Sequence, residues 1–529
     1  MSTGQVAGSL VQRTSLARFR RAQQALWLRL PPRFQQRVLW PEGLPRDDWH
    51  SFDRKPWQHP WLTPANLRSL RAFSDEWLAG MLRTVERDVD RPGRRYAFVG
   101  NIANNLYGRA KAMRDRPIEI TTVLHPQDDF LMGQPAWEEY DGDGMEGIQT
   151  LDAAKAAGMP LPEVPRVDRH ATVPWGDIRP EHLDWPMRFM DLKRFGPYFC
   201  NLPTLQALQD FDSILSVQVP YLAYLCGKPY VATQMGGDIW YECSRDDLHG
   251  RLQRQAFRSA RAFIVSNPWS MAFARRYAMN NMVYLPYLID EERYSPGEPS
   301  VRSAWQAATG GEFFVLVSSR LDYFFKGSHI AIAGFARLAQ QVPGARLVLT
   351  GWGADQDRAA ELFRKLGILD KVLVVPVAGK KKLVSYLRSA DCLLDQFTLG
   401  YYGASALEAM ACGVPVVMNI NRVQYDALLP EGAPPVLQAS CDQEVAAHLL
   451  ELQRSPDWRR RAGEQLRNWF LATHSNARWG RLYDAVIFGA ARGVLPSFGP
   501  SPLNEPLGAE EAAYHDAELA AAPKFPSYV

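Results

Sequence analysis

Residues 400–417 of the chain, GYYGASALEAMACGVPVV, decide how its fold is interpreted. An apolar strand that ends at Asp395 precedes them, and a glycine-bearing loop then leads into a short helix of good helix formers at 404–411. Gly413 can supply the left-handed cap that ends this helix, and Pro415 opens a buried apolar strand. A strand, a glycine turn and a helix N-terminus aim backbone N–H groups and a positive dipole end at one point, which suits phosphate.

Glu408 lies one turn further into the predicted helix. Its carboxylate can accept hydroxyl hydrogens from the molecule that carries the phosphate. An ordinary buried strand–helix–strand unit with Glu408 on a solvated face explains the same residues. Both interpretations stay open on this stretch alone, because a single motif is only a hypothesis.

The stretch resembles the nucleotide-sugar signature of retaining glycosyltransferases of family 4, in which two glutamates straddle such a loop and helix. Residues 407–417, LEAMACGVPVV, are similar to the second half of that signature, with Glu408 at the second glutamate. The first half departs from it. Gly400 stands where the family has the glutamate that contacts the donor sugar.

Length and composition indicate a globular protein of about two or three domains. The chain has 529 residues, and no apolar run is long enough to cross a bilayer. The net charge of +3 is too small to imply nucleic-acid binding. The six cysteines form no Cys-x-x-Cys pair, so neither zinc nor disulfides are indicated. With no apolar core of a secretory signal peptide, these features predict a cytoplasmic protein.

The first 41 residues are rich in arginine and contain no acidic residue. Wound as a helix, residues 13–30 gather Leu, Phe and Trp on one face and arginines on the opposite face. Such a helix can lie peripherally on the cytoplasmic face of a membrane. Docking on the rest of the protein is the alternative, and a transit peptide is a third interpretation.

A first α/β domain begins with an apolar strand at 96–99. Gly100 and Asn101 follow, then a helix at about 102–113, which together form the start of a βαβ unit with a tight turn beside a helix N-terminus. Glycosyltransferases of the two-domain GT-B fold open with a similar glycine turn. Residues 126–195 are polar, acidic and rich in proline, and we expect an insertion that shapes the acceptor side of the cleft.

Gly236, Gly237 and Asp238 follow another strand of this domain, at the edge where α/β sheets bind ligands. Asp238 can orient a sugar or an acceptor hydroxyl, and it is also a favoured helix N-cap. In the resembled family this position reads His-Gly-x-Asp. Met235 stands in for the histidine.

A second α/β domain begins with the unbroken apolar run 313–317, which suits a central parallel strand. Arg320 and Lys326 come just after it, where two cations can neutralise a leaving diphosphate. A pair of surface cations at a helix entry is the alternative. The segment resembles the family region in which an arginine and a lysine grip the donor diphosphate.

Three further features follow along the chain. Gly351 and Gly353 lie after a strand, and the family places a similar turn near the nucleotide base. The basic run 379–382, GKKK, is interpreted as a solvated helix start. A helix around 479–488 resembles the final family helix, which crosses back to the first domain.

The resemblance covers about residues 94–490 and implies an α/β protein of the GT-B fold, with two Rossmann-like domains facing a cleft. The predicted N-terminal extension, basic and rich in Trp and Pro, covers residues 1–92. An acceptor-side domain follows at 93–297, and a nucleotide-sugar domain at 298–470. The chain ends with a crossover helix at 471–495 and a flexible tail at 496–529.

The resemblance also implies transfer of a sugar from a nucleoside-diphosphate sugar to a glycan or lipid-linked acceptor, with retention and without a bound metal or other cofactor. Arg320, Lys326 and Asp238 are the implied catalytic residues. The implied donor-binding residues belong to the glycine turns and the Glu408 helix: Glu408, Gly403, Ala404, Ser405, Gly351, Gly353, Gly100, Asn101, Gly236 and Gly237.

Other activities fit the same fold. A nucleotide-sugar-binding protein that has lost turnover would explain Gly400 and Met235. A nucleotide-sugar epimerase would isomerise its ligand without an acceptor. A phosphorylase would need a pyridoxal-phosphate lysine, which the sequence does not identify.

Overall fold

The computed structural model describes residues 59–124, 131–144, 150–162, 205, 207–499 and 505–521. The predicted membrane contact of residues 13–30 and most of the predicted insertion at 126–195 lie outside these residues. Within them, no helix combines the length and the apolar content needed to cross a bilayer.

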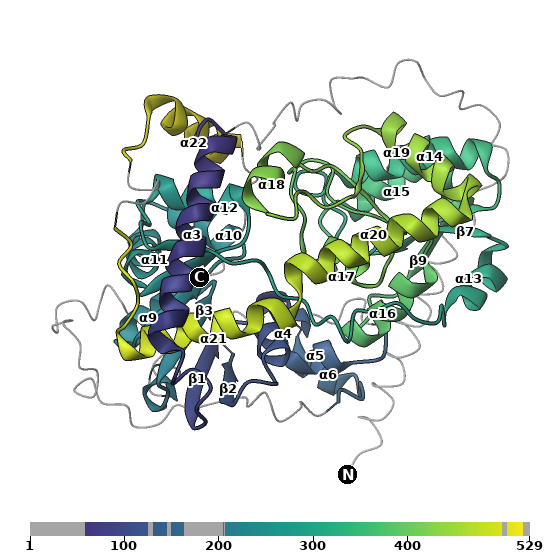
Figure 1. Ribbon diagram of the computed structural model, residues 1–529. Helices are drawn as coiled ribbons and strands as arrows, with labels where there is room; N and C mark the ends of the chain where they lie inside the picture. Colours follow the sequence, from purple (N-terminus) through teal and green to yellow (C-terminus); the bar gives the residue numbers. More distant parts are fainter. Residues whose placement is uncertain are drawn as a thin grey trace, which may run out of the picture.

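Two six-stranded parallel sheets form the framework, each at the centre of one lobe (Figure 1). The first lobe is built on a sheet with the order β2-β1-β3-β4-β5-β6. The strands, in chain order, are β1 (Arg94–Val99), β2 (Ile118–Val123), β3 (Ser213–Val217), β4 (Tyr230–Thr233), β5 (Ala262–Val265) and β6 (Met282–Tyr284).

The helices of the first lobe connect these strands and cover the sheet. They are α4 (Asn105–Ala112), α5 (Pro135–Glu139), α6 (Leu151–Ala156), α9 (Pro220–Cys226), α10 (Gly237–Trp240), α11 (Leu248–Ser259) and α12 (Pro268–Arg276). The predicted start of the first helix at about 102 is wrong, because Ala103 and Asn104 adopt left-handed backbone conformations (φ 52° and 58°). A short 3-10 turn, η3 (Ile102–Asn104), fills this interval, and α4 begins after it.

The second lobe is built on a sheet with the order β12-β11-β10-β7-β8-β9. Every residue of β7 and β8 is buried, as continuous apolar runs in a parallel sheet predict. The strands are β7 (Phe313–Val317), β8 (Ala345–Thr350), β9 (Val372–Val375), β10 (Cys392–Leu394), β11 (Val416–Met418) and β12 (Leu437–Gln438). The helices are α13 (Arg302–Thr309), α14 (Ser328–Gln341), α15 (Gln356–Lys365), α16 (Lys380–Ser389), α17 (Ala404–Ala411), α18 (Arg422–Leu428) and α19 (Asp442–Arg454).

Two consecutive helices carry the chain back from the second lobe to the first (Figure 1). α20 (Pro456–His474) packs on α17, and α21 (Asn476–Arg492) packs on β3 and β4. His474, at their junction, is buried and lies 2.7 Å from the Tyr287 carbonyl and 3.0 Å from the Tyr402 hydroxyl. Burial lowers the pKa of His474 to about 4, so its ring is neutral at physiological pH.

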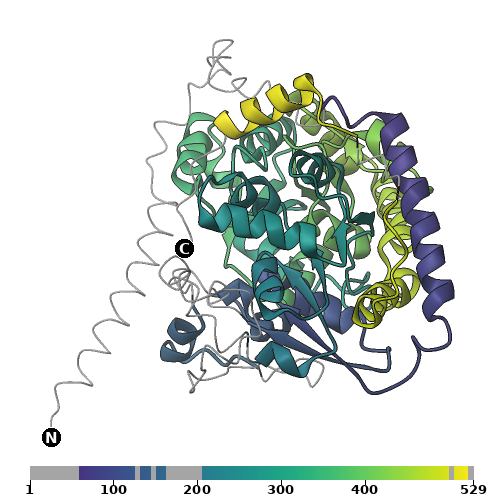
Figure 2. The same cartoon turned by 90° about the vertical axis from the view of Figure 1, so that its left-hand side faces the viewer.

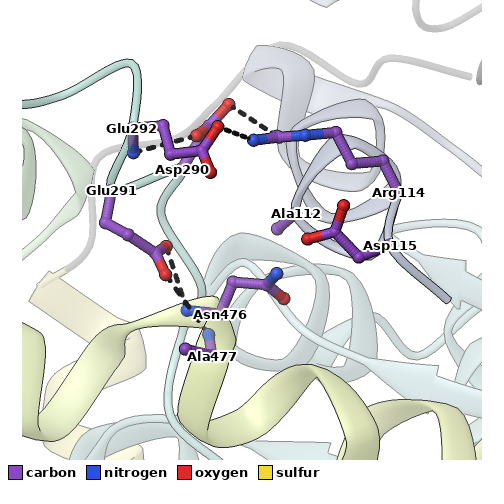
Figure 3. A pocket seen from close by; sticks show the side chains of 8 residues that line it. All are labelled: Ala112, Arg114, Asp115, Asp290, Glu291, Glu292, Asn476 and Ala477. Atoms are coloured by element: carbon purple, nitrogen blue, oxygen red, sulfur yellow. Dashed lines mark hydrogen bonds and ion pairs between the residues drawn. The ribbon is translucent and has the colours of Figure 1, made fainter.

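The linker between the lobes meets the start of α21 at a small polar cavity of about 110 Å³ (Figure 3). Arg114 pairs there with Asp290 and Glu292. Glu291 accepts hydrogen bonds from the backbone N–H groups of Asn476 (3.0 Å) and Ala477 (3.2 Å), which caps α21. These contacts fix the direction in which the crossover helix leaves the second lobe.

Helix α3 (Pro64–Val85) contacts both lobes. The hydroxyl of Ser74 accepts a hydrogen bond from the Tyr284 N–H of β6, 3.0 Å away, and α3 also packs on α21. On the other side, Arg71 donates to the Leu428 carbonyl at the end of α18. Thr63 caps the helix through the N–H of Asn66.

The prediction that the tail after residue 496 is loosely held is wrong for residues 509–521. These form α22 (Ala509–Ala521), which packs on α12 at the outside of the first lobe (Figure 2). Arg275 and Glu511 make a two-pronged ion pair there, with N–O distances of 3.0 and 2.9 Å, and both residues are buried. The Ala- and Glu-rich composition was typical of a solvated segment, but a long-range ion pair holds it.

Candidate active site

The N-terminus of α17 lies where residues 400–417 predict it, at the carboxyl edge of the second sheet. Gly403 precedes the helix, and no side chain caps its first N–H groups. Because the first N–H groups of a helix have no partner within the helix, this end can bind an anion. Ala404 and Ser405 form its first turn.

Lys326 lies beside this helix end. A methyl group placed on Gly403 would lie 3.7 Å from the Lys326 ammonium nitrogen. The ammonium is 3.0 Å from a carboxylate oxygen of the buried Asp395, which fixes its position. The following residue, Gln396, adopts a left-handed φ of 59°, an uncommon conformation for a residue other than glycine. The structure therefore brings Lys326 and Gly403 together, as a diphosphate grip requires.

Arg320 belongs to the same loop after β7. Its Nε donates to Asp322 at 2.9 Å, and its guanidinium lies 5.7 Å from the centre of the Phe325 ring. Its side chain is 43% exposed, so Asp322 orients it without burying it. An exposed, oriented guanidinium is available to a ligand in the cleft.

Gly353 packs directly on the Arg320 loop. It adopts a φ of 119°, and a methyl group placed on it would lie 2.4 Å from the Leu321 carbonyl oxygen. Hydrogen bonds from the Leu321 N–H to the Trp352 carbonyl (2.8 Å) and from the Asp355 N–H to the Leu321 carbonyl (3.1 Å) join the two turns. Gly351 packs against Val374 instead, because a methyl group placed on Gly351 would lie 2.8 Å from the Val374 side chain. Both glycines thus shape the turn through close packing.

Glu408 is buried, and its carboxylate lies 2.5 Å from the ammonium of Lys380 at the start of α16. The interpretation of the basic run as a solvated helix start is therefore wrong for Lys380. Burial opposes the charged ammonium, yet Glu408 and Glu138 together raise the pKa of Lys380. The sequence signal that could have found Lys380 is its place just after β9, at the carboxyl edge that also carries Arg320 and Lys326.

A buried ionic network extends from this pair into the first lobe. Glu139 of α5 lies 2.5 Å from Lys111 and 2.7 Å from Arg293 of the interlobe linker. Burial alone would raise the pKa of Glu139, but the Lys111 and Arg293 cations lower it to about 2. Glu138 pairs with Arg293 at 2.9 Å, and burial raises its pKa. Lys381 of α16 completes the connection, 3.4 Å from Glu139.

Residues 131–144 also dock on the second lobe through backbone and apolar contacts. The Gly379 N–H donates to the Gly142 carbonyl at 2.9 Å, and a methyl group placed on Gly379 would lie 2.2 Å from the Tyr140 carbonyl oxygen. Tyr140 and Trp137 share an apolar cluster with Val377, against which Trp352 packs. These residues of the predicted insertion thus reach the Gly351–Gly353 turn of the second lobe, and the expectation that the insertion shapes the acceptor side stays a prediction.

Gly100 and Asn101 are used inside the first lobe. Gly100 adopts a φ of 81°, and a methyl group placed on it would lie 2.3 Å from the Val217 carbonyl oxygen. The Asn101 amide accepts from the Tyr107 N–H (2.9 Å) and donates to the Gly133 carbonyl (2.6 Å). Both residues shape the turn into α4.

The turn before α10 is held by Asp238. Its buried carboxylate accepts hydrogen bonds from the N–H groups of Met235 (3.0 Å), Ile239 (3.0 Å) and Gln218 (3.3 Å). Burial raises the pKa of Asp238 to about 6, against the effect of these backbone donors. Gly236 and Gly237 complete this turn, and Gly236 adopts a φ of 103°.

Aromatic contacts bring the α10 turn close to the second lobe. Trp240 of α10 lies edge-on to Phe325, with ring centres 5.5 Å apart. Trp269 of α12 stacks on Tyr401 at 5.9 Å, next to Gly400. The structure thus gathers the Asp238 turn, the Lys326 loop and the α17 loop on facing edges of the two lobes.

Gly400 and Met235, which depart from the family signature, both lie in this region. Gly400 adopts a φ of 74°, a conformation that is unfavourable for residues other than glycine. Its carbonyl accepts a hydrogen bond from the Asn421 N–H at 2.7 Å. The Met235 sulfur lies 2.8 Å from the Asn105 amide nitrogen, and the side chain is 37% exposed. Among the described residues, no group of three or more His, Cys, Asp and Glu side chains could hold a metal ion.

Comparisons with known proteins agree with this architecture. Residues 303–469 match the family described as Glycosyl transferases group 1. The sucrose-phosphate synthase of Thermosynechococcus elongatus superposes with a TM-score of 0.50 and 18% identity, covering 74% of this chain and 98% of that one. Anabaena HepE, crystallised with UDP and glucose, gives a TM-score of 0.50 and 17% identity over 73% of this chain and 96% of its own. The chain is therefore a GT-B protein, as predicted.

Within residues 303–469, the chain is similar to the group 1 glycosyltransferases. It is similar to the D-inositol 3-phosphate glycosyltransferase of Saccharomonospora viridis, 32% identical over 181 residues, which are 32% of this chain and 38% of that protein. It is also similar to the mannosylfructose-phosphate synthase of Agrobacterium fabrum, 29% identical over 152 residues, 27% of this chain and 34% of that protein. The matched segments thus span little more than a third of these relatives.

Proposed function

We propose that the protein transfers a sugar from a nucleoside-diphosphate sugar to a hydroxyl group of a glycan or lipid-linked acceptor, with retention of anomeric configuration. The observation that carries the proposal is the position of Lys326, whose ammonium lies beside Gly403 at the uncapped N-terminus of α17. A lysine and a helix end that converge on one point form a site for a diphosphate. The match of residues 303–469 to the Glycosyl transferases group 1 family supports the same conclusion.

The chemical step is departure of the nucleoside diphosphate from the anomeric carbon. The bond between the anomeric carbon and the phosphate oxygen breaks, and its electron pair leaves on the diphosphate. The acceptor oxygen forms the new bond to the anomeric carbon and gives its proton to the leaving diphosphate. Arg320, Lys326 and the N–H groups of α17 take up the developing negative charge. No metal or other cofactor is part of this proposal.

Glu408 would hold the ribose hydroxyls of the nucleotide. The Lys380 ammonium orients this carboxylate, since it lies 2.5 Å from one carboxylate oxygen. Asp238 would act by fixing the turn at 235–239, because its oxygens accept backbone N–H groups. The turn then presents the acceptor hydroxyl to the sugar.

A binding protein without turnover is the second candidate, and Gly400 is the observation that favours it. Glycine cannot hold sugar hydroxyls by a side chain. We favour the enzyme, because Arg320, Lys326 and Glu408 are all present and Gly400 leaves room for a bulkier sugar. Residues close to Gly400 in the chain, such as Thr398 and Tyr401, can form hydrogen bonds with the sugar hydroxyls in place of a glutamate.

Calorimetry with nucleoside diphosphates and their sugars tests the proposal, starting with UDP and UDP-glucose. We expect one nucleotide sugar to bind more tightly than its diphosphate, and slow release of that diphosphate without an acceptor. Lys326→Ala should weaken binding, whereas Lys365→Ala, with a side chain 59% exposed on α15, is the matched control. Equal binding of sugar-bearing and sugar-free nucleotides, with no turnover in a broad acceptor screen, would identify a binder.

A further inference from the structure

Arg109 is a fully buried cation in the first lobe. Its side chain extends from α4, and none of its surface is exposed. One terminal nitrogen donates to the Thr233 hydroxyl at the end of β4, 3.1 Å away. The other terminal nitrogen and Nε have no hydrogen-bond partner. Three of the five N–H donors of a guanidinium belong to these two atoms.

No negative charge balances Arg109 among the residues that the structure describes. Its guanidinium lies over the rings of Tyr287 (5.2 Å) and Tyr483 (5.5 Å). Burial raises the pKa of Tyr287 to about 12 and also raises that of Tyr483, so both rings are neutral. Stacking on neutral rings attracts a cation but leaves its N–H donors unused.

Two more buried side chains, Asn105 of α4 and Gln234 after β4, each have an amide oxygen without a hydrogen-bond partner. Asn105 precedes Arg109 by one helical turn on the same face of α4, and its side-chain oxygen accepts no hydrogen bond. Gln234 follows Thr233, and its side-chain oxygen has no partner either. Both residues are at most 3% exposed. Helix α4 and the end of β4 therefore carry guanidinium donors together with acceptors for hydroxyl hydrogens.

An unpaired buried cation and unsatisfied amide oxygens are costly in a folded protein. A ligand that carries a phosphate and hydroxyl groups would satisfy all of them. We propose that Arg109, Thr233, Asn105 and Gln234 form a subsite for the phosphate group and adjoining hydroxyls of a phosphorylated acceptor. This inference rests on the proposed transferase function, because it assigns a chemical class to the acceptor.

The position of the subsite fits an acceptor. Thr233 ends β4 at the carboxyl edge of the first sheet, and the turn held by Asp238 follows it directly. Tyr287, whose ring covers Arg109, is linked to the loop before α17, because His474 lies 2.7 Å from the Tyr287 carbonyl and 3.0 Å from the Tyr402 hydroxyl. A phosphate on Arg109 would thus place the attached hydroxyls toward the proposed nucleotide site.

Met235 provides the means of entry. Its side chain is 37% exposed and caps Asn105 through the sulfur contact of 2.8 Å. Methionine is unbranched and flexible, so it can move aside at low cost. The departure from the family signature at this position then has a function, because a methionine covers the subsite until the acceptor arrives.

Calorimetry on the full-length protein in chloride buffer tests the subsite. The probes are inorganic phosphate, a hexose 6-phosphate and the same hexose without phosphate. We expect the hexose phosphate to bind more tightly than inorganic phosphate, and the plain hexose not to bind. If inorganic phosphate binds as tightly as the hexose phosphate, the anion site stands but its ligand is the free ion.

Arg109→Met keeps an unbranched stem between the tyrosines and removes every donor. It should weaken phosphate binding about 10- to 100-fold. Arg114→Met is the control, since that arginine is already paired with carboxylates. Equal phosphate binding by the wild type and Arg109→Met, or no binding of any phosphate to the wild type, overturns the subsite.

Thr233→Val covers the case in which Arg109→Met does not fold. Valine keeps the shape of threonine and removes the hydroxyl that positions Arg109. Phosphate binding should weaken several-fold, and unchanged binding refutes the assignment. Binding of nucleoside diphosphates to the wild type is measured separately, so failure of the phosphate subsite and failure of the transferase proposal give different results.

Discussion

Replacing Lys380 by methionine should destabilise the second lobe, because it leaves the Glu408 carboxylate buried without a partner. The two side chains are 21% and 4% exposed, and their charged atoms are 2.5 Å apart. Methionine keeps the length and the apolar stem of lysine. The change therefore removes the charge and little else.

The size of the effect follows from burial. Removing one partner of a fully buried ion pair costs about 3–5 kcal/mol. Partial exposure of Lys380 screens the pair, so we expect about 2–3 kcal/mol. For a lobe of this size, 1 kcal/mol corresponds to about 2–4 °C in Tm, which predicts a loss of about 4–12 °C.

Thermal unfolding of Lys380→Met, Glu408→Gln and the double variant measures the coupling between the two residues. The double variant should recover most of the loss, because two neutral groups need no ion pair. Lys382→Met on the same helix is the control and should unfold like the wild type. If Lys380→Met and the double variant lose the same stability, the two residues do not form a coupled pair and the reasoning fails.

Four further predictions follow from the structure. Arg320→Ala and Lys326→Ala should each lower kcat by about 10²–10³ with normal folding, and near-normal transfer by either variant would contradict the diphosphate grip. Stability should fall as the pH decreases from about 4.5 towards 2, by about 3 kcal/mol for Glu139, since its lowered pKa favours the ionised native form; unfolding curves across this range measure it. Asp484→Asn should cost about 3–5 kcal/mol in denaturant unfolding, because this fully buried carboxylate is paired with two arginines, and a loss below 1 kcal/mol would contradict it. Gly400→Glu should destabilise the protein by about 1–2 kcal/mol without tightening sugar binding, because φ is 74° at this position; calorimetry and Tm together decide.

Local sequence patterns were sufficient to predict the main elements of the second lobe. The helix expected at 404–411 is α17, and the apolar run at 313–317 is β7. A run of helix formers between two glycines predicts a short helix without knowledge of distant contacts. An unbroken apolar run likewise predicts a buried strand of a parallel sheet. The arrangement of Lys326 beside Gly403 follows from the parallel sheet, since both loops leave the same edge.

Distant contacts explain what the sequence could not predict. Lys380 and Glu408 are 28 positions apart, and nothing in either local pattern announces their pairing. Glu139 and Arg293 are separated by 154 positions, and their pairing depends on how residues 131–144 dock on the second lobe. Nothing in the local sequence marks Arg109 as buried. Only the fold shows that it is buried, with no carboxylate paired to it among the residues that the structure describes.

Helix α3 has a consequence for how the lobes can move. It is fastened to β6 and α21 of the first lobe and rests on α18 of the second. A rotation about the junction at His474 must therefore slide α18 along α3 and break the bond from Arg71 to Leu428. Helix α3 therefore restrains rotation of one lobe against the other. We expect a shortened protein that begins after residue 86 to lose this restraint together with the helix. Spectroscopic probes on α3 and α18 would report each opening event directly, without any ligand in the cleft.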